Sequence, residues 1–305
     1  GMVVVCLVAL AYAFWGNHLH GKLRHTGTTV WRMAEQMSLS TNGIFGSTVA
    51  ASATYIFMFT LFGEFLEYSG AGQFFIDIAF SLTGKARGGP AKMAVIASGL
   101  MGMISGSSTA NVTSTGTYTI PLMKKTGYRP AFSGAVEAAA STGGQIMPPI
   151  MGAAAFLMAE YMDTTYANVA VKAILPALLY FTGIFLAVHL EARRLDLKGI
   201  PRDQLPKFGL LIRSIYLLLP LVVLVWMVST GTRTLQFSAS IAILLAIAVS
   251  LPHLFADSRH GEGAASRFAK DTASMILGSL EAGGRSCITV AVACSMAGMV
   301  AGCIT

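Results

Sequence analysis

Charged residues are scarce in this sequence, and cysteines are fewer still. Of its 305 residues, 11% are Asp, Glu, Lys or Arg, whereas a soluble domain carries about a quarter. Its four cysteines form no CxxC pair, which gives no sign of a disulfide framework or a zinc site. A nucleotide-binding GxxxxGK[ST] motif is also absent. These absences exclude a soluble globular domain, a disulfide-stabilised scaffold and an ATPase motor within these residues.

Apolar residues are correspondingly abundant in the sequence. Hydrophobic residues make up 54% of the chain, and about twenty in a row suffice to cross a bilayer. Apolar segments recur at about 2–15, 46–69, 93–123, 131–162, 168–190, 213–230, 236–256 and 285–305. The pattern predicts an all-α polytopic membrane protein. The net charge of +7 is then read as cytoplasmic loop charge, and no nucleic-acid partner is expected.

Three mixed stretches lie between the apolar segments, at 28–40, 72–83 and 264–281. In each of them charged residues interrupt apolar ones at helix-like spacing. This spacing predicts helices that lie along the membrane interface.

The segment 93–123 does not fit a simple crossing, because its 31 residues are too many for one span and too few for two. Basic residues flank both ends, namely Lys85, Arg87 and Lys92 before it and Lys124, Lys125 and Arg129 after it. Positive charge marks the cytoplasmic side. The sequence therefore predicts a re-entrant hairpin with its tip, Ser105 to Asn111, near the bilayer midplane.

The topology that follows is mostly self-consistent. The connection 163–168 has no Lys or Arg and is expected outside, while the basic stretch 193–207 is expected inside. One loop disagrees, because Lys22, Arg24 and Arg32 would fall outside.

A faint internal repeat pairs the stretch 38–53 with 279–294. The two copies would enter the membrane from opposite sides, as inverted repeats of transporters do, although chance similarity of small-residue helices explains the pattern equally well. If the repeat is real, the second copy stops before its own hairpin. We therefore expect this chain to be a fragment.

The segment 131–162 contains a second irregularity. Gly143, Gly144, Pro148 and Pro149 lie within an otherwise apolar helix, and paired prolines remove two amide donors. The helix is predicted to break here, beside the hairpin tip, where exposed carbonyls suit a hard cation and amides an anion. The candidate ion and substrate site is Ser105, Gly106, Ser107, Ser108, Thr109, Asn111, Ser141, Thr142, Gly143, Gly144, Pro148 and Pro149. A merely kinked helix, with hydroxyls bonded to its own backbone, stays the alternative.

Carboxylates within membrane segments are functional candidates by default. Glu64 and Glu67 lie towards the end of one segment, and Glu137 and Glu160 towards the two ends of the broken helix, where side chains can reach water. Among them, Glu137 is a possible supporting residue of the site. The hairpin and the break contain no titrating side chain, and their neutral oxygens favour Na⁺ over H⁺ as coupling ion. No cofactor and no other metal are expected.

These residues resemble the large membrane subunit of tripartite ATP-independent periplasmic (TRAP) transporters, particularly fused permeases associated with TAXI-type binding proteins. The resemblance is strong over about 28–200 and weak over 264–305. It runs through Gly43 to Gly46, Gly88 to Lys92, Ser105 to Ser108, Ala110 to Val112, Thr119 to Met123, Gly127-Tyr128 and Val136 to Pro149. Two departures are Met147-Pro148-Pro149-Ile150, where many relatives have Ile-Pro-Pro-Ser, and the absence of the family's second hairpin.

The resemblance implies an elevator-type secondary transporter in the cytoplasmic (inner) membrane of a bacterium or archaeon. Sodium would drive uptake of organic anions, carboxylates, which a periplasmic substrate-binding protein delivers, with a small membrane subunit or its fused equivalent as a further partner. We divide the chain into N-terminal scaffold helices and interfacial arm (1–83), a transport-domain half (84–162), connecting transmembrane helices (163–263) and the start of a second inverted repeat (264–305).

An intramembrane serine hydrolase is the competing interpretation. Ser105 or Ser107 would be the nucleophile, and His189 or His253 the base. The predicted topology places both histidines near the cytoplasmic surface, about 10 to 15 Å from a tip at mid-depth. The transporter, which is not an enzyme, is therefore preferred.

Overall fold

The computed structural model describes residues 1–304, except 202–205, 207–210, 212–213, 232 and 259–263. The described part is mostly helical and contains no strand. Among the described residues, four helical segments are long and apolar enough to cross a membrane, namely Ser47–Thr83, Tyr166–Arg194, Leu235–Pro252 and Arg267–Cys303. The expected all-α polytopic membrane architecture is confirmed.

The chain forms two compact units. The first combines Gly1–Phe57 with Gly284–Thr305 and contains α1 (Met2–Trp15), α2 (Val30–Leu39), α3 (Ser47–Ala51) and the last part of α14 (Ala264–Ile304). Its core is formed by Ala13, Met33, Met37 and Cys303. The helix expected within 28–40 is therefore present as α2.

Glycines let the end of α14 pack tightly within this unit. A side chain at Gly298 or Gly302 would collide with the backbone carbonyls of Gly43 and Asn42. Thr48 Oγ1 also donates a hydrogen bond to the carbonyl of Cys294, at 3.0 Å. The two helices of the expected repeat are thus in contact, while the repeat itself stays a prediction.

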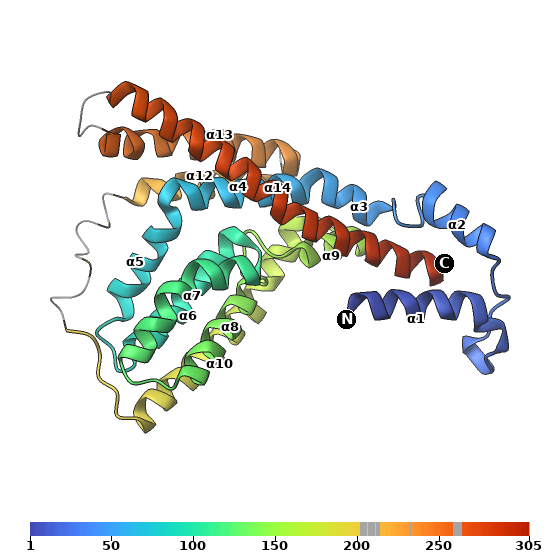
Figure 1. Ribbon diagram of the computed structural model, residues 1–305, viewed down its shortest axis with the longest axis horizontal. Helices are drawn as coiled ribbons and strands as arrows, with labels where there is room; N and C mark the ends of the chain where they lie inside the picture. The colour runs from blue at the N-terminus through green and yellow to red at the C-terminus, as the bar shows by residue number, and fades with distance from the viewer. Residues whose placement is uncertain (202–205, 207–210, 212–213, 232, 259–263, 305) are drawn as a thin grey trace. The chain divides into compact units, whose positions relative to one another are not determined.

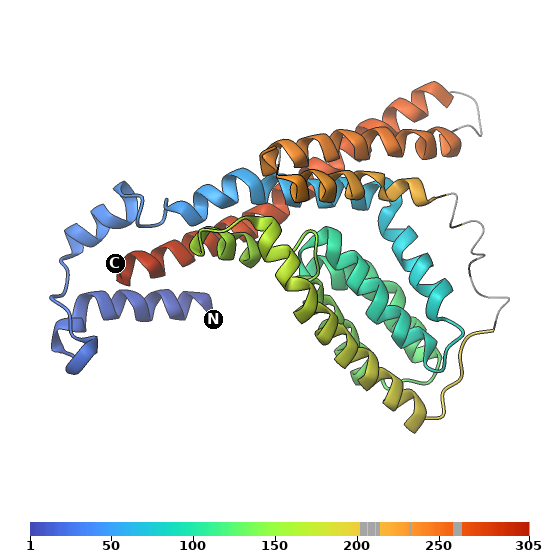
Figure 2. The ribbon, with the colours of Figure 1, turned by 180° about the vertical axis from the view of Figure 1, so that it is seen from behind.

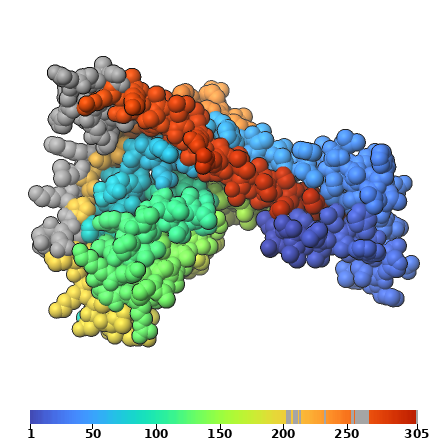
Figure 3. Space-filling model, in the orientation of Figure 1, coloured from blue at the N-terminus to red at the C-terminus, as the bar shows by residue number. Residues whose placement is uncertain are grey.

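The second unit, Met58–Gly283, holds the hairpin and the helix break. Its helices are α4 (Phe57–Leu66), α5 (Gly72–Thr83), α6 (Gly89–Ser105), α7 (Ser108–Lys125), α8 (Pro130–Gly144), α9 (Ala153–Tyr161), α10 (Tyr166–Arg194), α12 (Leu219–Thr230), α13 (Leu235–Ser258) and the first part of α14. Helices α6, α7, α8 and α10 run side by side (Figures 1 and 2). In the space-filling view the α7 and α8 surfaces meet without a visible gap (Figure 3).

The mixed stretch 72–83 matches a helix of its own, whereas the stretch 264–281 is wrong as a separate element. Placement of these helices along the membrane interface stays a prediction. Residues 72–83 form α5, which continues the helical path of α4 through a kink at Gly70, where φ is +93°. Residues 264–281 form the first part of the single helix α14. The charged Lys270 and Asp271 do not end α14, because both are exposed on its surface and no proline interrupts the backbone there.

The hairpin expected at 93–123 is formed by α6 and α7, joined at Gly106 and Ser107. Glycine is needed at Gly106, where φ is +58°. The open ends of the hairpin lie together, since Tyr128 Oη, just after α7, donates to the carbonyl of Gly88, just before α6, at 3.5 Å. At 1.5 Å per residue the arms are about 25 and 27 Å long. A tip at the midplane of a core about 30 Å thick therefore requires a strongly tilted hairpin.

The helix predicted across 131–162 is interrupted. Helix α8 ends at Gly144, and α9 begins at Ala153. The eight residues between them, 145–152, include Pro148 and Pro149, which cannot donate backbone hydrogen bonds.

Candidate functional site

The hairpin tip and the helix break are in direct contact. The amide of Ile150, in the break, donates to the carbonyl of Met103, near the end of α6, at 3.2 Å. Gln145 Nε2 donates to Ser108 Oγ at 3.4 Å. A Cβ atom at Gly106 would come within 2.9 Å of the Met151 carbonyl oxygen. The two irregular segments singled out in the sequence therefore form one junction.

A glycine pair sets the spacing of this junction. Gly102 of α6 and Gly144 of α8 face each other so closely that a side chain on either would collide with the backbone of the other. Small residues allow such close approach between membrane helices. The end of α8 is thereby held against the last turn of α6.

The polar side chains of the tip are engaged locally. Ser107 caps α7, because its Oγ accepts a hydrogen bond from the amide of Ala110 at 3.4 Å, and it also contacts Thr109 Oγ1 at 3.1 Å. Ser105 Oγ donates to the Ser107 carbonyl at 3.5 Å. Asn111 is fully buried, and its Nδ2 donates to the Ser98 carbonyl at 2.7 Å.

Four predicted site residues do not face the tip. Thr142 is exposed and its hydroxyl donates to its own helix. A side chain at Gly143 would collide with the Tyr180 ring of α10. Pro148 and Pro149 line a separate cavity of about 200 Å³ together with residues of α10 and α12.

Glu137 lies at the centre of a buried cluster of hydroxyl groups, which we call the hydroxyl cage. Its side chain is 0% exposed. Oε1 accepts hydrogen bonds from Ser98 Oγ at 2.9 Å, from Ser141 Oγ at 3.2 Å and from Thr115 Oγ1. Oε2 accepts one from Thr119 Oγ1 at 2.5 Å. Glu137 therefore joins α6, α7 and α8 through one carboxylate.

The ion pairs in the described part of the chain, Arg87–Asp196 and Arg194–Glu191, do not include Glu137. A buried carboxylate without a cationic partner costs several kcal/mol of desolvation. Hydrogen bonds from four hydroxyls offset that cost. The structure thus gives Glu137 a central place, whereas the sequence assigned it a supporting one.

The residues that sequence analysis missed are Ser98, Thr115 and Thr119. A signal for two of them was present, because Asn111, Thr115 and Thr119 recur every four residues and lie on one face of α7. Which acidic residue they meet is decided by the packing of α8.

The geometry does not support the serine hydrolase. His189 lies close enough to Lys92 to interact with it electrostatically, and Lys92 is in the first turn of α6 while Ser105 ends that helix. Thirteen residues of helix separate these two positions by about 20 Å. The side chain of His253 lies outside the described residues.

The sequence matches, over residues 1–305, the family described as "Tripartite ATP-independent periplasmic transporter, DctM component". This chain belongs to that family. The TRAP permease membership expected from the sequence resemblance is therefore confirmed.

Three relatives show how much of a TRAP permease these residues represent. The C4-dicarboxylate TRAP transporter large permease protein DctM of Pseudomonas aeruginosa is 29% identical over 205 residues, 67% of this chain and 47% of that protein. Its namesake in Vibrio cholerae is 30% identical over 148 residues, 48% of this chain and 31% of that protein. A putative TRAP transporter large permease protein of Haemophilus influenzae is 26% identical over 197 residues, which are 63% of this chain and 45% of that protein. The matched region thus spans about half, or less, of each relative.

Proposed function

We propose that this chain is part of a secondary active transporter that imports organic anions of the carboxylate class with a sodium gradient. Two relatives are named as C4-dicarboxylate permeases, which supports the substrate class. The tripartite periplasmic description of the family supports two partners, a periplasmic substrate-binding protein and a small membrane subunit or its fused equivalent. A cytoplasmic (inner) membrane location follows from that partnership.

The observation that carries the proposal is the junction between tip and break, next to a buried carboxylate. In the part of the chain that the structure describes, no hydrogen bond ends on the carbonyls of Ile146, Met147 and Pro148. Carbonyl and hydroxyl oxygens are the ligands that hard cations prefer, and the negative charge of Glu137 favours a cation nearby. The residues present therefore fit Na⁺.

We further propose that the segment 84–162 moves as one body in an elevator mechanism. The hydroxyl cage joins α6, α7 and α8 through Glu137, and the Gly102–Gly144 contact joins the tip to the break. Such cross-links keep the site geometry fixed while the body moves.

Sodium titration of transport tests the proposal. The protein is reconstituted in liposomes with its binding protein, and uptake of a radiolabelled C4-dicarboxylate is measured against sodium concentration. Ser107→Gly removes the tip hydroxyl, while glycine at a helix N-cap costs only a few tenths of a kcal/mol. We expect the half-saturating sodium concentration to rise about fivefold or more, the effect of losing one ligand worth about 1 kcal/mol.

The control is Thr117→Val, which removes an exposed hydroxyl from the same hairpin and should leave the sodium dependence unchanged. Equal sodium dependence in wild type and Ser107→Gly would remove the tip from the ion site. Uptake that needs no sodium but follows an inward proton gradient would contradict sodium coupling.

The re-entrant placement has its own test. Ala86→Cys and Ala131→Cys lie just outside the two ends of the hairpin and leave its basic flanks intact. A membrane-impermeant maleimide should label both from the cytoplasmic side only. Labelling from opposite sides would contradict a re-entrant hairpin.

A further inference from the structure

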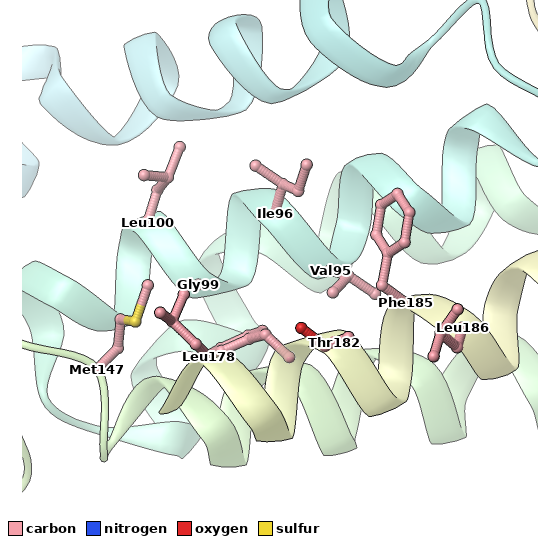
Figure 4. Close-up of a pocket in the computed structure, with 10 residues that line it drawn as sticks. Val95, Ile96, Gly99, Leu100, Met147, Leu178, Thr182, Phe185 and Leu186 are labelled. Carbon is pink, nitrogen blue, oxygen red and sulfur yellow. The ribbon is translucent and has the colours of Figure 1, made fainter. Parts of the chain in front are cut away.

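A second cavity lies between α6 and α10, and one end of it reaches Met147 of the helix break. Its volume is about 280 Å³. Its lining includes Val95, Gly99 and Leu100 of α6 and Leu178, Thr182 and Leu186 of α10 (Figure 4). Thr182 is the polar member of these six. We call this cavity the α6–α10 groove.

Helix α10, which forms one side of the groove, is largely exposed. This helix is one of the candidate membrane spans, yet only 11% of its most apolar window is buried. Leu178 and Leu186 are 53% and 55% exposed. If α10 crosses the membrane, an apolar groove on its exposed side would be in contact with acyl chains.

One end of the groove is strongly basic. Phe185 reaches from α10 towards α6 (Figure 4), and the ammonium of Lys92 lies 5.2 Å from the centre of its ring. Lys92 is only 6% exposed. His189 follows one turn later on α10, and its Nδ1 is buried with no hydrogen-bond partner among the described residues. Arg193 follows after another turn, and the charges of Lys92 and Arg193 both act on the His189 ring.

The neighbouring carboxylates do not neutralise this end. Glu191 pairs with Arg194 and Asp196 pairs with Arg87, each at 2.8 Å. The described part of the chain shows no ion pair for Lys92. Lys92 also lies in the first turn of α6, where the helix dipole adds further positive potential. The basic end is therefore complementary to an anion.

We propose that the α6–α10 groove binds one anionic phospholipid of the cytoplasmic leaflet. One acyl chain would lie between the two helices, and the phosphate would lie against Lys92, His189 and Arg193. The eight-residue step from Leu178 to Leu186 gives the groove a length of about 12 Å, which accommodates part of an acyl chain. Basic pockets between membrane helices on the cytoplasmic side suit anionic headgroups.

Native mass spectrometry of the detergent-purified protein tests the proposal. Phosphatidylglycerol and phosphatidylcholine with matched acyl chains are added at equal concentration, and inorganic phosphate is added in a separate arm. We expect wild type to retain phosphatidylglycerol preferentially. Lys92→Gln should lower the bound fraction about fivefold, the effect of one cation worth about 1 kcal/mol. Thr182→Trp, which fills the groove, should lower it as well.

Lys172→Gln is the matched control, because Lys172 is an exposed cation near the other end of α10. It should bind phosphatidylglycerol as wild type does, and circular dichroism verifies the fold of each variant. Retention of the lipid by Lys92→Gln, or an equal loss in Lys172→Gln, would overturn the proposal. Binding of inorganic phosphate as tight as that of phosphatidylglycerol, unaffected by Thr182→Trp, would also overturn it, since the groove would then contribute nothing.

Discussion

Substituting Thr119 by valine tests whether the hydroxyl cage stabilises the buried charge of Glu137. Valine has the shape of threonine without its hydroxyl. Thr119 Oγ1 donates to Oε2 of Glu137 at 2.5 Å. In the described part of the chain, no other side chain donates a hydrogen bond to Oε2. Loss of the Thr119 hydroxyl leaves one oxygen of a fully buried carboxylate unpaired. A hydrogen bond to a charged group contributes about 1.5–3 kcal/mol, so we expect the free energy of unfolding to fall by about 2–3 kcal/mol.

Thr117→Val is the control on the same helix. Thr117 is exposed, and its hydroxyl donates to the Ser114 carbonyl one turn earlier at 3.2 Å. Surface substitutions of this kind change stability by less than about 0.5 kcal/mol. The assay is unfolding of the detergent-solubilised protein by SDS, followed by far-UV circular dichroism, with the two variants compared under identical conditions.

A double-mutant cycle separates charge from packing. In a Glu137→Gln background the partner is a neutral amide, whose nitrogen can donate to a threonine oxygen. Leaving it unpaired costs less than leaving a carboxylate unpaired, so we expect Thr119→Val to cost about 1 kcal/mol or less there. Equal costs in the two backgrounds, or Thr119→Val equal to Thr117→Val, would refute the idea that the cage compensates a buried charge.

Two further predictions concern packing and titration. Gly143→Ala should destabilise the protein, because its methyl group would collide with the Tyr180 ring. Gly134→Ala, on the same helix with open space around it, should be neutral or stabilising. Thermal unfolding in detergent compares the two variants, and equal unfolding midpoints would contradict the packing argument. Burial, with a smaller contribution from the Glu191 carboxylate, raises the pKa of Tyr128 to about 12. The folded state therefore holds this proton where the unfolded chain loses it, and the associated stability, complete below pH 10, is lost between pH 10 and 12. Absorbance at 295 nm, wild type minus Tyr128→Phe, should show an un-ionised phenol at pH 11, and ionisation near pH 10 in the folded protein would contradict this.

The sequence located the irregular segments because local chemistry produces them. Pro148 and Pro149 cannot donate backbone hydrogen bonds, and the small residues around Gly106 permit a tight turn. The helix break and the hairpin turn can therefore be predicted without knowledge of the packing. The sequence predicted the helix at 72–83 correctly, but it erred at 264–281, where exposed charges such as Lys270 suggested a separate helix. Charge on one helical face does not stop a helix, and the backbone of α14 continues past it.

The sequence by itself determined that this protein is helical and membrane-embedded. Its charge is scarce and its apolar segments are long, and in a bilayer such segments must form their backbone hydrogen bonds internally, as helices do. It also placed polar residues on single faces, as with Asn111, Thr115 and Thr119 of α7. Only the tertiary structure decided what those faces meet. Glu137 becomes the partner of Thr119 because α7 and α8 pack closely at Gly116, where an added side chain would crowd Glu137. Such pairings depend on side-chain volumes across helices far apart in sequence, which no local pattern encodes.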